Sequence, residues 1–214
     1  MTFWLYHIVR TLIAVLLKLL TRWQVRGGEN VPRQGGLLVV ANHLHNADPP
    51  LVGVSLGRKA VFMAKQELFR SRLSSYFMHS LGTFPVRRGR LDRRALRQAE
   101  QVLAQGLALI MFPEGMRSRN AQLMPAFPGS VVIALRNGVP ILPVGITGTE
   151  KMKGIAWLWR RPQITVNIGR PFSLPVVNSR LTKAELAELT SSVMERIAKL
   201  LPVEYHGNYA KQGN

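Results

Sequence analysis

Residues 36–41 read GLLVVA, and the polar sequence NHLHNAD follows at once at positions 42–48. A continuous apolar run of this length favours a β-strand that is covered on both faces, as in a mostly parallel sheet. Similar runs occur at 60–64, 107–112, 140–146 and 163–168. Because these runs alternate with helical patterns, the sequence predicts a three-layer α/β fold with a mostly parallel central sheet flanked by helices.

Periodic apolar positions predict helices between and after these runs. Asp92 is the expected N-cap of a helix that ends at Gly106, and its inward-facing residues are Ala95, Leu96, Ala99, Val102 and Leu103. Thr182 and Glu185 form a capping-box pattern at the start of a second helix, which Pro202 closes. Both helices have an apolar face with which to cover the sheet.

Composition limits the classes of function. The chain has 214 residues, of which 47% are hydrophobic and 19% charged, so it has enough apolar material for one folded core and is not globally disordered. Lys and Arg number 29 against 11 Asp and Glu, and the formal net charge of +18 predicts an anionic partner. The chain contains no cysteine, which excludes thiolate nucleophiles, disulfides, cysteine-ligated zinc and iron–sulfur clusters.

Residues 3–20, FWLYHIVRTLIAVLLKLL, predict an amphipathic helix. At about 100° per residue its polar positions fall in one narrow stripe, and they are His7, Arg10, Thr11 and Lys18. Two cations interrupt a segment that is already shorter than the roughly 20 apolar residues of a spanning helix, so we expect it to lie in the membrane interface. A core-packed helix is the alternative. A cleaved signal peptide is disfavoured, because the apolar stretch runs into Thr21-Arg22-Trp23 without a small-residue cleavage site.

The sequence therefore predicts three parts: an N-terminal interfacial membrane helix at 1–22, a single α/β domain at 23–202 and a C-terminal tail at 203–214. We expect the anionic partner to be a membrane lipid surface, with the protein associated with the cytoplasmic face of the membrane. A non-enzymatic nucleic-acid-binding protein fits the charge alone. No zinc finger, helix-turn-helix or aromatic RNA-binding motif is present in the sequence, and the basic residues are spread along it, so we expect no nucleic-acid partner.

Polar sequences follow three of the predicted strands. NHLHNAD follows the first run, RRGR at 87–90 follows a run that ends in Phe84-Pro85-Val86, and PEGMRSR at 113–119 follows the run at 107–112. In open α/β sheets ligands bind beyond the carboxyl ends of the strands, so these segments are the first place to look for chemistry. Together they supply a titratable base, carboxylates and guanidinium groups, which suits a phosphate-bearing substrate that must lose a proton.

His43 and Asp48 are the candidate catalytic pair. A histidine titrates near neutrality and can accept a proton from an attacking hydroxyl, while a carboxylate on its other ring nitrogen fixes the tautomer. Five residues separate the two, so the turn between them has to double back before a helix that starts at Pro49. The alternative is that Asp48 is only a helix N-cap with Pro49 at the first helical position, and both roles are compatible.

The chain resembles the glycerolipid acyltransferase family, which includes the 1-acylglycerol-3-phosphate acyltransferases, at all four of the family's motif blocks. The matching blocks are Asn42-His43 with Asp48, Gly82-Thr83-Phe84-Pro85-Val86-Arg87-Arg88-Gly89, Phe112-Pro113-Glu114-Gly115-Met116-Arg117-Ser118, and Val139-Pro140-Ile141-Leu142-Pro143-Val144. Their order and spacing also fit, over about half of the chain. Two departures concern the substrate: Met116 replaces the usual threonine, and Phe127-Pro128-Gly129 stands where many members have a lysine before the glycine.

The resemblance implies an O-acyltransferase that moves a fatty acyl group from acyl-CoA or acyl carrier protein to the free hydroxyl of 1-acyl-glycerol-3-phosphate, giving phosphatidic acid. Glycerol 3-phosphate, another lysophospholipid or a lipid alcohol is the alternative acceptor. His43 is the expected base and Asp48 its orienter. Arg88 and Arg117 are expected to bind the acceptor phosphate, Glu114 to hold one arginine in place, and Gly115 to permit a tight turn near the ligand.

We expect no metal and no cofactor other than the acyl-donor substrate, and direct transfer without a protein nucleophile. A metal-dependent hydrolase is the alternative from another reaction class, because His43-Leu44-His45 with Asp48 superficially resembles a binuclear zinc signature. The match fails on spacing, since the aspartate follows the second histidine by three residues and precedes Pro49 where a further histidine is required.

Overall fold

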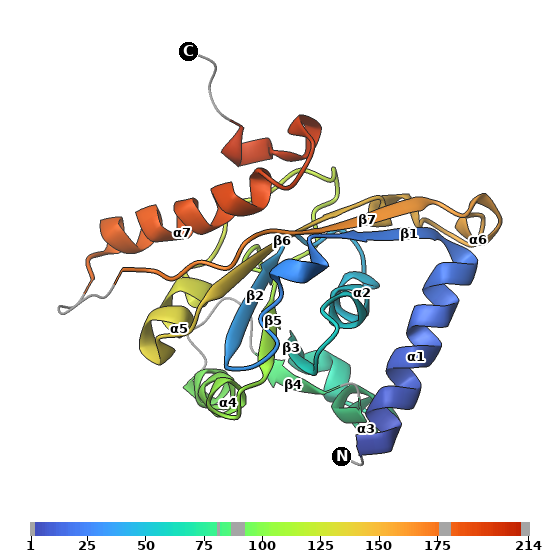
Figure 1. The fold of residues 1–214 in the computed structure, drawn as a ribbon, viewed down its shortest axis with the longest axis horizontal. Helices are drawn as coiled ribbons and strands as arrows, with labels where there is room; N and C mark the ends of the chain where they lie inside the picture. The colour runs from blue at the N-terminus through green and yellow to red at the C-terminus, as the bar shows by residue number, and fades with distance from the viewer. Residues whose placement is uncertain (1–2, 81, 87–92, 176–180, 211–214) are drawn as a thin grey trace.

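The computed structural model describes residues 3–80, 82–86, 93–175 and 181–210. Within these residues, seven strands form one sheet in the order β1-β7-β6-β2-β5-β3-β4 (Figure 1). The strands are β1 (Arg22–Arg26), β2 (Leu37–Ala41), β3 (Ala60–Lys65), β4 (Thr83–Val86), β5 (Ala108–Met111), β6 (Ile141–Thr147) and β7 (Gln163–Ile168). Neighbouring strands are parallel except for β6 and β7, which are antiparallel. The predicted mostly parallel sheet is confirmed.

Helices cover both faces of this sheet (Figure 1). The helices are α1 (Phe3–Leu20), α2 (Asp48–Ser55), α3 (Arg72–Ser80), α4 (Arg93–Ala104), α5 (Gly129–Asn137), α6 (Trp157–Arg160) and α7 (Lys183–Ala198). One apolar cluster joins Leu38 and Val40 of β2 to buried residues of α4, α5 and α7, and a second joins Leu37 and Val39 to α2 and to Leu17 of α1. Alternate β2 side chains therefore enter opposite cores, which is the three-layer α/β arrangement that the sequence predicts.

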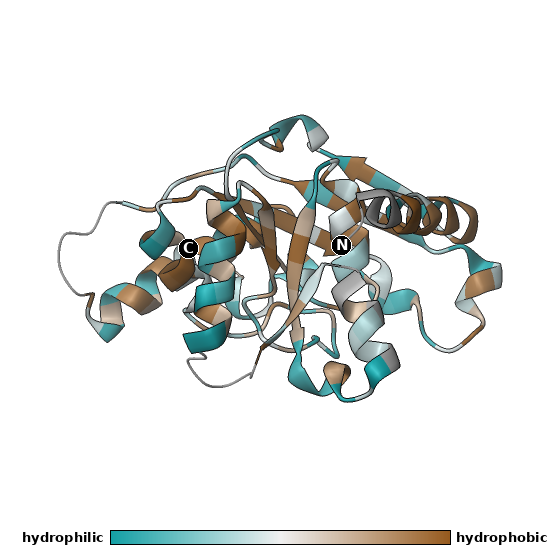
Figure 2. Cartoon of the chain, turned by 90° about the horizontal axis from the view of Figure 1, so that it is seen from below, coloured by the Kyte–Doolittle hydropathy of each residue, from teal (hydrophilic) through white to brown (hydrophobic). Residues whose placement is uncertain are grey.

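The centre of the sheet is hydrophobic because its strands have no solvent-facing side. All five residues of β2 are fully buried, and β5 and β6 pair with β2 on either side. Figure 2 shows the hydrophobic colouring concentrated in these central strands and also along α1. Continuous apolar runs without alternation are the expected pattern for such doubly covered strands.

The edge strand β1 does not follow this pattern, and the sequence analysis did not predict it. Its sequence RWQVR has no continuous apolar run, because it pairs only with β7 and four of its five side chains are exposed. Pairing with a distant strand, which local sequence does not encode, makes this segment extended.

The predicted helices form with small differences at their ends. Ala95, Ala99 and Leu103 of α4 are buried as expected, while its predicted N-cap, Asp92, lies outside the described residues. The capping box between Thr182 and Glu185 is present at the start of α7. That helix ends at Ala198, four residues before Pro202, and α2 begins at Asp48, one residue earlier than predicted.

The segment that follows α7 packs back onto the domain. Tyr205 is buried, its backbone carbonyl accepts a hydrogen bond from the Leu123 N–H (2.8 Å), and the Leu123 carbonyl accepts one from the Asn208 N–H (3.3 Å). Gly207 between them has φ +48°, and a Cβ at this position would lie 2.4 Å from the Leu123 carbonyl oxygen. The C-terminal segment therefore holds the long loop between β5 and α5.

Asn42 at the end of β2 links the two central strands and gives the first prediction. Its side-chain Nδ2 donates to the Ile146 carbonyl (2.9 Å) and its Oδ1 accepts from the Ile146 N–H (2.7 Å), all within the buried interior. We expect Asn42→Ala to lower the free energy of unfolding by about 2–4 kcal/mol, since two buried backbone groups lose their partners. Urea denaturation measures this, with Gln24→Ala on the exposed side of β1 as the control that changes little; equal losses for both variants would contradict the prediction.

Candidate active site

The carboxyl ends of β2 and β5 bring the predicted catalytic residues together. His43 follows β2 by two residues and Glu114 follows β5 by three, and the two strands are parallel neighbours. The Glu114 Oε1 accepts a hydrogen bond from the His43 N–H at 3.0 Å. Two of the three polar segments therefore meet at one edge of the sheet, as the sequence analysis expected.

His43 and Asp48 form a buried pair. The His43 Nδ1 and Asp48 Oδ2 atoms are 2.9 Å apart, and the side chains are 7% and 0% exposed. With an ionised Asp48, Nδ1 carries the proton and Nε2 is left as the acceptor, which is the tautomer that a general base requires. The turn does double back as predicted.

Asp48 is held by the turn that it closes. Its Oδ2 also accepts hydrogen bonds from the backbone N–H groups of Leu44 (2.6 Å) and His45 (2.7 Å). The alternative interpretation of Asp48 as a helix N-cap is wrong: Ala47 occupies the N-cap position, and Asp48 is the first residue of α2 with its carboxylate directed to the preceding turn. One oxygen thus collects three N–H donors and fixes the loop to the imidazole.

Phe112 packs against the imidazole ring of His43. The two ring centroids are 4.3 Å apart with an angle of 27° between the planes. This stacking, together with the hydrogen bond to Asp48, determines the orientation of the imidazole. In the sequence, Phe112 is recognised only as a member of a motif block. Its position directly after β5 and two residues before Glu114 was the one indication that it lies near the site.

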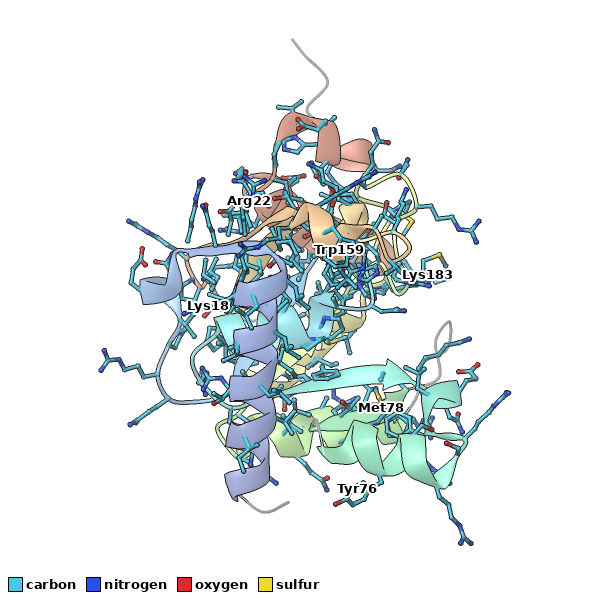
Figure 3. The ribbon with its side chains drawn as sticks, turned by 90° about the vertical axis from the view of Figure 1, so that its right-hand side faces the viewer. Lys18, Arg22, Tyr76, Met78, Trp159 and Lys183 are labelled. Carbon is cyan, nitrogen blue, oxygen red and sulfur yellow. The ribbon has the colours of Figure 1, made fainter. Side chains whose placement is uncertain are left out.

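The imidazole lies at the wall of an apolar cavity of about 540 Å³. The walls come from the N-terminal helix, from the sheet and from the segments around it, and they include Ile13, Leu17 and Leu20 of α1, Pro50 and Leu51 of α2, Phe62 and Ala64 of β3, Met78, Phe112 and Trp157. Figure 3 shows Met78 on the α3 side of this region, with α1 in front. No local sequence pattern predicts this cavity beneath α1, because its inner wall is assembled from segments far apart in the sequence.

Glu114 supports the site through the backbone. Besides the His43 N–H, it accepts a hydrogen bond from the Met124 N–H at 2.9 Å through Oε2, and it is 2% exposed. Both Glu114 oxygens bind backbone N–H groups, and among the described residues no salt bridge joins Glu114 to an arginine; Arg88 lies outside these residues, so the expectation that Glu114 holds an arginine stays a prediction. Burial raises the pKa of Glu114 to about 7, and this effect outweighs the opposing hydrogen bonds.

The turn after Glu114 presents Arg117 at the surface of the site. Gly115 has φ +70°, as a tight turn requires, and a Cβ there would lie 2.9 Å from the Phe127 ring. Arg117 is exposed, and its charge adds to the burial that lowers the pKa of His45. Arg117 therefore lies within electrostatic reach of the His43–Asp48 turn. Arg88, the other predicted phosphate ligand, lies outside the described residues.

A shared metal centre is not assembled at this turn. Among the described residues, no three His, Asp or Glu side chains are grouped to ligate a metal ion. His45 instead has its Nδ1 accepting a hydrogen bond from the Ala47 N–H at 3.3 Å, as expected of a polar turn residue.

Comparison with known proteins agrees with this arrangement. The family model named Acyltransferase matches residues 22–147, from the start of β1 to the end of β6, a span that contains the whole His43–Glu114 constellation. The chain belongs to the acyltransferase family. It is accordingly an acyltransferase of lipid biosynthesis, the class to which the named relatives belong.

Three proteins with named activities are similar to this acyltransferase. The 1-acyl-sn-glycerol-3-phosphate acyltransferase of Bacillus subtilis is 26% identical over 92% of this chain and 96% of its own length. The lyso-ornithine lipid O-acyltransferase of Pseudomonas aeruginosa is 34% identical over 63% of this chain and 56% of its own. The crystal structure of the 1-acyl-sn-glycerophosphate (LPA) acyltransferase PlsC from Thermotoga maritima superimposes with a TM-score of 0.68 at 27% identity, covering 91% of this chain and 79% of that one.

Glu114 gives a prediction about the stability of this acyltransferase. The folded protein keeps the Glu114 proton up to about pH 7, whereas an unfolded glutamate loses it near pH 4.5. The unfolded state binds fewer protons between these values, so stability falls as the pH rises through them. We expect the free energy of unfolding of the wild type to decline by on the order of 2–3 kcal/mol relative to Glu114→Gln over this interval. Urea denaturation across the interval measures it, and parallel curves for the two proteins would refute it.

Proposed function

We propose that this acyltransferase moves a fatty acyl group from the thioester of acyl-CoA or acyl carrier protein to the free hydroxyl of 1-acyl-glycerol-3-phosphate, giving phosphatidic acid. The observation that carries the proposal is the buried His43–Asp48 pair at the wall of an apolar cavity. The named activities of the Bacillus subtilis relative and the Thermotoga maritima neighbour support the acceptor.

The reaction in this proposal needs one base and no protein nucleophile. An alcohol is almost wholly protonated at neutral pH, so His43 Nε2 removes the hydroxyl proton as the oxygen attacks the thioester carbonyl. Asp48 stabilises the imidazolium that forms, and the collapsing intermediate expels the thiolate, which takes up the proton. Direct transfer within a ternary complex fits a chain without cysteine, and the mechanism requires no cofactor beside the acyl donor and the acceptor.

The cavity suits an acyl chain better than a polar substrate. It is lined almost entirely by aliphatic and aromatic side chains, and its volume of about 540 Å³ is within the usual range for small-molecule sites. An acyl chain in it places the carbonyl or the hydroxyl beside His43, where the apolar wall ends. The low polarity of this wall also excludes water, which would otherwise compete with the alcohol for the thioester.

The phosphate of the acceptor lies, in this proposal, on the exposed side of the turn. Arg117 and Arg88 bind it through paired guanidinium hydrogen bonds, while Glu114 and Gly115 shape the loop that presents Arg117. Glu114 acts as a positioning residue because it holds the backbone of both His43 and Met124.

The acceptor approaches from a membrane surface in this proposal. Among the described residues of α1, the exposed large apolar side chains are Ile8, Leu12, Val15, Leu16 and Leu19, which follow helical spacing along one stripe. The stripe suits insertion among acyl chains at the cytoplasmic face, where the thioester donors are available, with residues 1–22 as the membrane segment and 23–202 as the catalytic domain. In the part of the chain that the structure describes, no helix has the length and hydropathy required to cross a bilayer.

The first test concerns the base. We expect His43→Ala and Asp48→Asn to reduce kcat by about 10²–10⁴-fold, the usual contribution of a positioned base, with the fold retained by circular dichroism. His45→Ala, two residues away in the same turn, is the matched control and should keep most of its activity. Full activity of His43→Ala would remove this residue from the mechanism, and an acyl-enzyme detected by mass spectrometry would replace direct transfer.

The second test concerns the acceptor. Arg117→Ala should raise the KM for 1-acyl-glycerol-3-phosphate by about tenfold to a hundredfold, because a charge-assisted contact to phosphate is lost, and should leave the donor KM unchanged. Arg119→Ala, also exposed on this loop, is the control. A change confined to the donor KM would assign Arg117 to the other substrate.

A second acceptor class has its own support. The relative named lyso-ornithine lipid O-acyltransferase is 34% identical, and Met116 and Phe127, which depart from the family pattern, are both exposed beside this turn. A panel of lysophospholipids, lyso-ornithine lipid and glycerol 3-phosphate, each assayed with acyl-CoA and with acyl carrier protein, decides the acceptor and the donor together.

A further inference from the structure

The segment between β6 and β7 exposes apolar side chains that the proposed reaction does not use. Within the described part of the chain, Trp159 of α6 is the most exposed large hydrophobic residue at 88%, and Ile155 just before the helix is 75% exposed. Trp157 points the other way, into the apolar core and the cavity wall. The segment is therefore anchored in the domain by Trp157, and on its outer face Ile155 and Trp159 are left exposed by the described part of the chain.

This outer face is fixed beside α1. The Arg161 Nη2 donates to the Lys18 carbonyl (3.1 Å), one of the last carbonyls of α1, and the Arg161 carbonyl accepts from the Arg22 Nε (3.2 Å). Figure 3, which faces α1, shows Trp159 on the same side of the molecule as Lys18 and Arg22. The segment around α6 therefore extends the surface of α1 and is hydrogen-bonded to its C-terminal end.

The charges around Trp159 have one sign. Its exposed basic neighbours on this segment and on α1 and β1 are Lys18, Arg22, Lys151, Lys153, Arg160 and Arg161. Glu150, the acidic residue of the segment, has its oxygens bound to the Gly148 N–H and the Tyr205 hydroxyl. Among the described residues, none of these six exposed cations forms a salt bridge, although Arg22 and Arg161 also donate to backbone carbonyls. No carboxylate neutralises their charges, so they can attract an external anion.

We propose that the β6–β7 segment, residues 154–161, is a second lipid contact that enters an anionic bilayer beside α1. The inference rests on the membrane role given to α1 in the proposed function. Tryptophan with flanking arginine and lysine is typical of the membrane interface, where the ring enters the acyl boundary and the cations meet lipid phosphates. We favour a bilayer over a protein partner because α1, to which Arg161 is hydrogen-bonded, also exposes large aliphatic side chains.

The two contacts have a consequence for substrate entry. Leu17 of α1 and Trp157 of α6 both line the cavity beside His43, so each membrane contact is the outer side of a cavity wall. A single helix could rotate about its axis at the interface, whereas a second contact point sets the orientation of the domain. Two-point attachment holds the cavity against the bilayer, from which acyl chains arrive.

The absence of cysteine allows a direct test on the full chain. Ile155→Cys is labelled with an environment-sensitive fluorophore and mixed with vesicles of equal parts phosphatidylcholine and phosphatidylglycerol that carry nitroxide-labelled acyl chains. Val203→Cys, also 75% exposed but in the segment after α7, is the matched control. We expect a blue shift and strong quenching of the probe at position 155 and neither at position 203.

Two outcomes would overturn the inference. If the protein floats with the vesicles but the probe at position 155 behaves like the probe at 203, α1 binds lipid alone. If the probe at 155 responds to acyl carrier protein, or to rising concentrations of unlabelled enzyme without vesicles, the face binds protein instead. Because vesicle binding does not require turnover, a failure of the proposed reaction would leave this result unaffected.

Activity provides the second readout. We expect Trp159→Ser to bind the anionic vesicles several-fold more weakly and to lose a similar factor in rate on vesicle-embedded acceptor, while its kcat on detergent-dispersed acceptor stays the same. Val203→Ser is the control and should match the wild type in both assays. An equal loss in vesicles and in detergent would show that Trp159 acts on the fold and would contradict the lipid contact.

Discussion

The carboxylate of Asp48 organises the site by collecting three N–H donors on one oxygen. The imidazole of His43 and the backbone N–H groups of Leu44 and His45 are all hydrogen-bonded to Oδ2 of this fully buried side chain. A buried charge needs hydrogen bonds to replace water. The three donors supply them at Oδ2, whereas the buried Oδ1 has no hydrogen-bond partner among the described residues. The position of Asp48 in the first turn of α2 also places the charge where the helix dipole favours it. The same hydrogen bonds that hold this loop in its fold therefore also orient the imidazole of His43.

A second buried carboxylate repeats this arrangement from the neighbouring strand. Glu114 binds the backbone N–H of His43 on one side and that of Met124 on the other, so it joins the end of β2 to the loop that follows β5. That loop is held in turn by the C-terminal segment through Leu123 and Tyr205. Residues from position 43 to beyond position 200 therefore contribute to one rigid frame, in which the base faces the cavity and Arg117 faces solvent.

The other half of the site is defined by α1, which has two apolar faces with different neighbours. Its inner face closes the cavity over the sheet, and its outer stripe is exposed together with Trp159 of α6. In the proposed function, α1 therefore contributes both to the cavity beside His43 and to the lipid contact, and Leu16 takes part in both. This arrangement gives a short path for a substrate whose head is anionic and whose tail is insoluble in water.

The sequence by itself determined the parts that depend on local pattern. The doubly covered strands, the helix faces of α4 and α7, and the pairing of His43 with Asp48 follow from apolar runs, capping residues and motif spacing, because each is encoded within a short segment. Tertiary structure decided the rest. Strand β1 is extended because it pairs with β7, Glu114 accepts hydrogen bonds from the backbone N–H groups of His43 and Met124, and Phe112 stacks on His43. These contacts join segments that are far apart in the sequence, and a local sequence pattern does not specify which distant segments pack together.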